Sequence, residues 1–304
     1  MNINFKTFFM RNSIALLMAM AFAVTGCEKS QILTEKTEIS SENRQKVLFF
    51  TPSFGLETDI SSWKPDNGLK SRNSRARMED YADSLLCVDY MDGKLVQKQA
   101  KSVSDLFPLT LYYGLHDLRF LGHSSTDWEL DEEKGIFRVG KVTETFLKCV
   151  PIEVDEKTDE NLMLQMDRVV TKLTLLIEDA IPENVAEMEL TMGGHMAALD
   201  MATGLGVAEE KKDYSISWKL GDSYAGMKGL KLTLYSFCEE GEFEASLRVT
   251  ARDAAGKVIQ DRMASGIPLL KNRCTVAKGR IFSHQGGVTF TEPGEWIPQY
   301  EVDF

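Results

Sequence analysis

The stretch FEASLRVTAR, residues 243–252, decides the fold class of this chain. Apolar residues alternate with polar ones along it, so Phe, Ala, Leu, Val and Ala share one side and Glu, Ser, Arg, Thr and Arg the other. A period of two is typical of a β-strand with one face on a core and the other in solvent. The turn-forming residues Asp253–Gly256 then predict a second strand at Lys257–Gln260.

The rest of the second half has the same character. The stretch RVVTKLTLLI, residues 168–177, is apolar on both of its sides, which predicts a central strand of a sheet. Only Pro182–Leu190 favours a short helix, with the proline in its first turn. Further strands are predicted at Tyr214–Trp218, Leu230–Phe237, Asn272–Phe282, Val288–Phe290 and Tyr300–Phe304.

The first half is also rich in strand signals. Its clearest hairpin joins Leu85–Tyr90 to Leu95–Gln99 through Asp92-Gly93, because such a pair adopts the positive φ that a tight hairpin turn requires. A short strand at Val47–Phe50 is expected to end at Thr51-Pro52. Further strands are predicted at Leu109–Leu115, Leu118–Gly122, Ile136–Val139 and Thr145–Val154. Short strands with polar turns throughout predict an all-β chain in which sheets pack on sheets.

The N-terminus has the layout of an export signal. Lys6 and Arg11 precede an uncharged apolar run that is too short to span a bilayer. The run ends in Val24-Thr25-Gly26-Cys27, which resembles the bacterial lipoprotein box. We therefore expect cleavage after residue 26 and lipidation of Cys27, which would hold the chain on a membrane without a spanning helix. The alternative is an ordinary secreted protein with a chance cysteine at the cleavage site.

Charge and composition narrow the partners and divide the chain. Without residues 1–26 the formal charge changes from −11 to −13, because that segment holds two basic residues and no acid. An acidic surface argues against nucleic acid as a partner. The acidic stretch Asp155–Glu160 is the strongest break in composition. We predict a signal peptide at 1–26, a lipidated tether at 27–44, and β-sandwich domains at 45–164 and 165–304.

The four cysteines beyond Cys27 leave two interpretations open. They are Cys87, Cys149, Cys238 and Cys274. An exported chain can pair them, for example Cys87 with Cys149 and Cys238 with Cys274. They can equally be buried thiols that act as small apolar residues.

No motif of catalysis or cofactor binding stands out, so we expect neither an enzyme nor a cofactor or metal. The four histidines form no metal-binding pair, and structural roles are expected for His116 and His123. The acidic segment Trp128–Gly135 lacks the ligand spacing of a calcium loop and predicts an acidic turn. The arginines Arg72, Arg75 and Arg77 lie in a predicted surface loop at Ile60–Asp80, which is either simply solvated or a site for an arginine-specific protease.

Five stretches in order resemble a known family. They are Arg77–Gln97, Leu111–Ser125, Thr143–Val154, Met166–Leu190 and Ile267–Phe282. Together they are similar to the fimbrillin-associated anchor and accessory subunits of the type V fimbriae of the Bacteroidales, and the lipoprotein box agrees with that family.

The resemblance implies two tandem transthyretin-like β-sandwich domains and a role in fimbria assembly as an anchor, accessory or tip subunit. It carries over no catalytic residues. In shaft subunits of this family an arginine-specific protease removes the first strand, but Arg72, Arg75 and Arg77 lie later than that cut requires. This departure favours a subunit that keeps its lipid.

The sequence therefore predicts a lipid-anchored fimbrial subunit of the outer membrane that acts in assembly and cell adhesion by β-strand addition. Its partners would be other fimbrial subunits and the membrane, besides an unidentified ligand on a host or bacterial surface. The candidate donor or edge strand contains Val288, Phe290, Tyr300, Val302 and Phe304. The alternative is a surface glycan-binding lipoprotein that uses exposed tryptophans such as Trp63 and Trp128.

Overall fold

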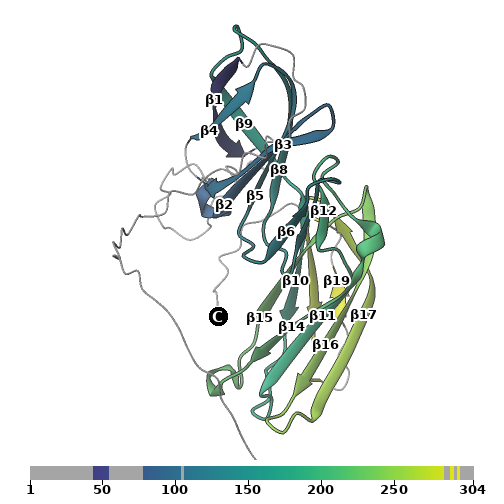
Figure 1. Cartoon of the computed structure of the whole chain (residues 1–304). Coiled ribbons are helices and arrows are strands. Elements are labelled where there is room, and N and C mark those ends of the chain that lie inside the picture. Colours follow the sequence, from purple (N-terminus) through teal and green to yellow (C-terminus); the bar gives the residue numbers. More distant parts are fainter. Residues whose placement is uncertain (1–43, 55–77, 104–105, 284–287, 291–292, 295–304) are drawn as a thin grey trace, which may run out of the picture. The chain divides into compact units, whose positions relative to one another are not determined.

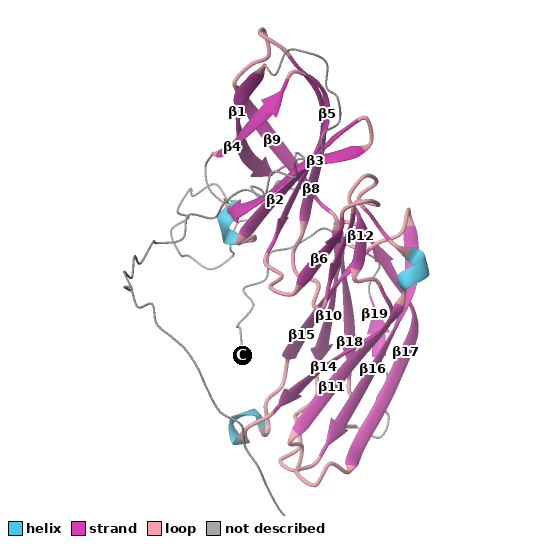
Figure 2. Ribbon diagram, viewed as in Figure 1, coloured by secondary structure: helices cyan, strands magenta, loops and turns pink. Residues whose placement is uncertain are grey.

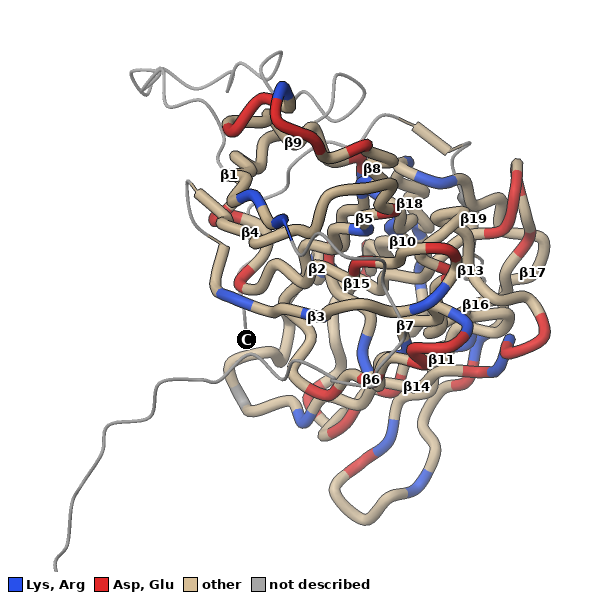
Figure 3. The backbone as a smooth tube through the Cα atoms, turned by 45° about the horizontal axis from the view of Figure 1, so that its top comes forward, with Lys and Arg blue, Asp and Glu red and all other residues tan. Residues whose placement is uncertain are grey.

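The predicted all-β class is confirmed by a computed structural model, which describes residues 44–54, 78–103, 106–283, 288–290 and 293–294. Strands dominate this part of the chain, and its helical elements are single 3₁₀ turns (Figures 1 and 2). No helix in the described ranges is long and apolar enough to cross a bilayer. Acidic and basic residues are interspersed along the backbone, and an acidic stretch marks the turn at residues 155–160 (Figure 3).

The first group of strands forms one sheet of seven that folds into two layers. Its order is β3-β2-β5-β8-β9-β1-β4, and β8 and β9 share only two residue pairs, so the sheet bends there. The two layers enclose an apolar core in which the rings of Phe50 and Phe120 lie 4.8 Å apart. The strands are β1 (Gln45–Phe54), β2 (Ser84–Met91), β3 (Lys94–Ser102), β4 (Phe107–Tyr112), β5 (Gly114–His123), β8 (Phe146–Val154) and β9 (Asn161–Arg168).

The second group is a sandwich of two four-stranded sheets. One has the order β15-β10-β18-β19 and the other β14-β11-β16-β17. Both sheets contribute to one large apolar cluster. The strands are β10 (Val170–Ile177), β11 (Glu187–His195), β14 (Lys212–Lys219), β15 (Leu230–Phe237), β16 (Glu242–Arg252), β17 (Val258–Leu270), β18 (Cys274–Gly279) and β19 (Val288–Phe290).

A small sheet joins residues from both halves of the sequence. The hairpin of β6 (Trp128–Asp131) and β7 (Ile136–Val139) pairs through β7 with β12 (Ala198–Asp200), which in turn pairs with β13 (Leu205–Gly206). Phe137 and Val139 belong to the same apolar cluster as the second sandwich. The hairpin is thus packed on the C-terminal core although it precedes the predicted domain boundary in sequence.

Several predictions of elements can be compared with the structure. The Asp92-Gly93 turn has φ values of 51° and 72°, as its hairpin requires, and β10 is an inner strand with both faces covered. The helix expected at Pro182–Leu190 is wrong, because Met188 and Leu190 are buried alternately in β11. The predicted end of β1 at Thr51-Pro52 is also wrong: β4 pairs only as far as Phe50, so Pro52 needs no amide donor toward it.

The predicted boundary between residues 164 and 165 falls within β9, which pairs with β1 in the first sheet. The chain passes to the second sandwich at Val169, between β9 and β10. Whether residues 45–164 and 165–304 fold as separate units stays a prediction.

Candidate functional site

The C-terminal segment supplies the last strand of a sheet. Strand β19 pairs antiparallel with β18 over three residue pairs, Ala277 to Phe290 through Gly279 to Val288. Gly294 then exchanges two backbone hydrogen bonds of 3.0 Å with Cys274. Val288 and Phe290, two of the candidate donor- or edge-strand residues, lie in β19, and their role in joining subunits stays a prediction. Tyr300, Val302 and Phe304 lie outside the described residues.

Strand β4 ends the seven-stranded sheet, and side chains bond two of its outward carbonyls. The Tyr113 amide donates to the Arg44 carbonyl, which sets the phase of the β1–β4 ladder and turns Pro108, Thr110 and Tyr112 outward. Pro108 has no N–H to offer. The Gln97 amide donates to the Thr110 carbonyl at 3.0 Å, and His116 bonds the Tyr112 carbonyl at 2.8 Å.

The buried pair of His116 and Asp89 holds this closure in place. Nδ1 of His116 lies 2.7 Å from Oδ1 of Asp89, while Nε2 faces the Tyr112 carbonyl, and both side chains are inaccessible to solvent. Both partners of the ring are acceptors, so both ring nitrogens donate and the imidazole is charged. Burial alone would lower the pKa of His116, but the hydrogen bond and the charge of Asp89 outweigh it and raise the pKa.

The other two described histidines are buried without a carboxylate partner. His123, whose structural role was predicted, packs its ring against Trp128 and Phe137 at centroid distances of 5.7 and 4.9 Å. His195 stacks on Tyr214 and bonds the Tyr235 carbonyl through Nε2 at 3.1 Å. Burial lowers the pKa of each to about 4, so both rings are neutral at pH 7.

The junction between the two halves carries ion pairs that the sequence did not reveal. Arg138 of β7 forms a forked salt bridge with Glu210, with bonds of 2.6 to 3.0 Å. Arg168, which is 2% exposed, donates to Glu144 and to Asn272 at 3.2 and 3.1 Å. These partners are 24 to 104 residues apart in sequence, so no local pattern could have found them.

The acidic segment and the cysteines beyond Cys27 can be placed in the structure. No group of three His, Cys, Asp or Glu among them could hold a metal ion. The acidic segment at 128–135 is the β6–β7 hairpin, in which Asp131 bonds the amides of Lys134 and Gly135 through its side chain and carbonyl. Cys87, Cys149 and Cys238 are free thiols, so neither of the bridges considered above is formed.

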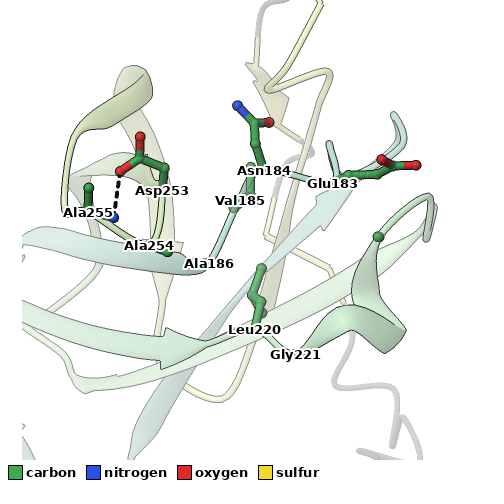
Figure 4. A pocket seen from close by; sticks show the side chains of 10 residues that line it. Glu183, Asn184, Val185, Ala186, Leu220, Gly221, Asp253, Ala254 and Ala255 are labelled. Atoms are coloured by element: carbon green, nitrogen blue, oxygen red, sulfur yellow. Dashed lines mark hydrogen bonds between the residues drawn. The ribbon is translucent and has the colours of Figure 1, made fainter.

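One concavity among the described residues is an open surface hollow between turns. It has a volume of about 430 Å³ and is lined by three turns, at residues 183–186, 220–225 and 253–255 (Figure 4). The Asp253 carboxylate there accepts hydrogen bonds of 2.9 Å from the backbone amides of Ala255 and Lys257. The Glu183 side chain points away from the concavity (Figure 4). Trp128, the described candidate for glycan stacking, packs instead against His123 and Phe137.

Several predicted site residues cannot be placed. The lipidation site Cys27, the arginines Arg72, Arg75 and Arg77, and Trp63 lie outside the described residues. Their roles stay predictions from the sequence.

Comparison with known proteins shows a likeness of fold. No family model matches the sequence, and no curated protein matches it. An adhesin candidate from Bacteroides ovatus aligns over 84% of this chain and 97% of its own length, with 11% identity and a TM-score of 0.51. A second adhesin candidate from that species covers 80% and 87%, with 14% identity and a TM-score of 0.49.

A third solved structure is the tip fimbrial protein Mfa3 from Porphyromonas gingivalis with a C-terminal truncation. It aligns over 83% of this chain and 100% of its own, with 12% identity and a TM-score of 0.44. Of these three likenesses, the first is close enough to show a shared fold, and at such identities the fold is what it shows.

Proposed function

We propose that this chain is a lipid-anchored subunit of a surface fimbria, of the anchor, accessory or tip type, which acts in assembly and cell adhesion. The observation that carries the proposal is β19: the C-terminal segment supplies a short terminal strand to an otherwise complete sheet. Neighbouring fimbrial subunits are the partners, and the subunits associate by β-strand addition.

Strand β19 suits exchange because little holds it. Among the described residues, three pairs of β19 and the bridge between Gly294 and Cys274 join this segment to β18, whereas the ladder between β10 and β15 has eight pairs. A longer strand from a neighbouring subunit would make more backbone hydrogen bonds along β18, and its alternate side chains would give specificity. The segment released from β18 would in turn be available to the next subunit.

Two further observations support this role over catalysis. The lipoprotein box at Val24–Cys27 would place the chain at the outer membrane, facing the cell surface. Among the described residues, no group of three His, Cys, Asp or Glu could hold a metal ion. The shared fold with an adhesin candidate is compatible with the same role. The proposal assigns no enzymatic activity.

The test uses the full chain in its own cells. Deletion of Glu295–Phe304 is expected to reduce recovery of the protein in high-mass fimbriae while leaving its membrane level unchanged. Cys27→Ala is expected to release it from the membrane, and mass spectrometry of the wild-type protein should show acyl groups on Cys27. Normal incorporation of the truncated chain would remove the tail from the joining mechanism, and an unmodified Cys27 would contradict the anchor.

A further inference from the structure

Strand β14 is an edge strand whose outer backbone groups are open. It pairs with β11 on one side, and no described strand pairs with the other. The Leu220 amide donates to the Ala186 carbonyl, which sets the phase of the ladder, so Tyr214, Ile216 and Trp218 bond β11. The N–H and C=O groups of the intervening residues therefore face away from the sheet; these residues are Asp213, Ser215, Ser217 and Lys219.

Three of the other edges of the two sandwiches are protected against pairing. On β15, the Tyr235 carbonyl is hydrogen-bonded to Nε2 of His195, and the Phe237 amide donates a hydrogen bond to the Met196 carbonyl. Strand β17 has two register shifts against β16, which bend an edge away from partners. Strand β3 carries three lysines, at positions 94, 98 and 101. Between Tyr214 and Lys219, β14 has no proline and no register shift against β11; the irregularity of this ladder lies at Asp213, opposite the segment between Met192 and His195.

The inner row of β14 is incompletely covered. Tyr214, Ile216 and Trp218 pack against the C-terminal core, yet all three are only half-buried. The residues directly opposite on β11, which are Met192, Leu190 and Met188, are at most 1% exposed. One more strand beside β14 would cover this aromatic and aliphatic row.

The geometry points to a second copy of this chain as that strand: two β14 strands pair antiparallel across a twofold axis and extend the sheet to eight strands. In the register centred on Ile216, Asp213 lies opposite the partner subunit's Lys219. Ser215 lies opposite the partner subunit's Ser217, and Tyr214 opposite the partner subunit's Trp218. Opposite charges, hydroxyl pairs and aromatic pairs are the cross-strand combinations that stabilise antiparallel sheets.

The charges at the two ends of β14 favour this register and a second copy of the chain as the partner. Asp213 and Lys219 are both exposed, and neither has an ion-pair partner recorded among the residues that the structure describes. The twofold axis repeats each contact, so both ends of the paired strands gain an ion pair. A shift that centres the pairing on Ser215 would instead place Asp213 opposite the partner subunit's Ser217, so both ion pairs would be lost.

The experiment measures the dimerisation constant of the full-length chain in detergent by sedimentation equilibrium, from about 1 to 100 μM, the range in which interfaces of this small size associate. Asp213→Lys and Lys219→Glu are each expected to weaken the dimer by about tenfold, because each puts like charges at both ends. An equimolar mixture of the two variants should regain the wild-type constant as a heterodimer, since each end then has opposite charges again.

Two proline substitutions test whether the outward backbone groups of β14 form the dimer. Ser217→Pro removes an outward N–H and should abolish the dimer without changing the melting temperature. Ile216→Pro, the matched control, removes a bond to β11 and should lower the melting temperature itself. A monomeric wild type at 100 μM overturns the proposal. So does a dimer that tolerates Ser217→Pro, or one whose charge variants do not recover on mixing, because another surface or the chain's own tail would then form the contact.

Discussion

Strands β4 and β14 both end a sheet, and they treat their outer backbone groups in opposite ways. On β4, a proline withholds a donor, and the Gln97 and His116 side chains bond the outward carbonyls of Thr110 and Tyr112. On β14 no described strand pairs with the outward groups. The difference shows that an edge is closed as much by side chains from strands further along the sheet, here β3 and β5, as by its own sequence.

The largest effect on the unfolding free energy is expected when the carboxylate that holds His116 beside β4 is removed. Asp89→Ala should destabilise the chain by about 3–5 kcal/mol, because it leaves the His116 imidazolium buried without its counter-ion. Asp213→Ala on the open edge is the matched control and should leave the unfolding free energy unchanged. Denaturant titration of the two variants measures both values. Equal small effects would mean that Asp89 does not anchor β4.

The pH dependence separates the histidine that closes β4 from the one that closes β15. His195 has a folded pKa of about 4, below its unfolded value of about 6.5, so its stabilising contribution is present above pH 6.5 and is lost as the pH falls toward 4. His195→Gln should remove about 3 kcal/mol of this acid sensitivity at pH 4, measured as the unfolding free energy against pH.

His116 should behave in the opposite sense. Its folded pKa is raised, so its contribution is present below the unfolded pKa of about 6.5 and is lost as the pH rises through the folded pKa. His116→Gln should therefore flatten the alkaline side of the same curve. If both variants changed the unfolding free energy on the same side of the pH curve, the assignment of a charged His116 ring and a neutral His195 ring would be contradicted.

The smallest effect is expected at the other bond that closes β4. Gln97→Ala removes the donors to Thr110 and Asp89 and should cost about 1 kcal/mol in unfolding free energy. Gln99→Ala is the control on the same strand, since no side-chain bond is recorded for Gln99 among the described residues. If the two variants unfold alike, Gln97 does not contribute to the closure.

Local patterns predicted most strands because their causes are local. The alternation in FEASLRVTAR corresponds to β16, and Asp92-Gly93 forms the expected turn. The helix at Pro182–Leu190 failed because its apolar spacing fits β11 equally well, and the tertiary partners β14 and β16 decide for a strand.

The contacts that the sequence could not predict depend on the order of strands in the sheets. The partners His116 and Asp89 lie 27 residues apart and meet only because β2 and β5 are neighbours. The pairing of β7 with β12 and the open side of β14 follow from the assembled sheets, so no motif announces them. The candidate lipid site is the reverse case, in which the signal at Val24–Cys27 is local and is read from the sequence alone.

The contrast between the two edges is tested most directly by amide hydrogen exchange at two protein concentrations, resolved by residue. The amides of Tyr214 and Ile216 should be protected at both concentrations, because they bond β11. Those of Ser215 and Ser217 should exchange freely in dilute solution and become protected in concentrated solution, while Thr110 and Tyr112 show no such change. Concentration-independent exchange at Ser215 and Ser217, or an equal response at Thr110, would contradict the account.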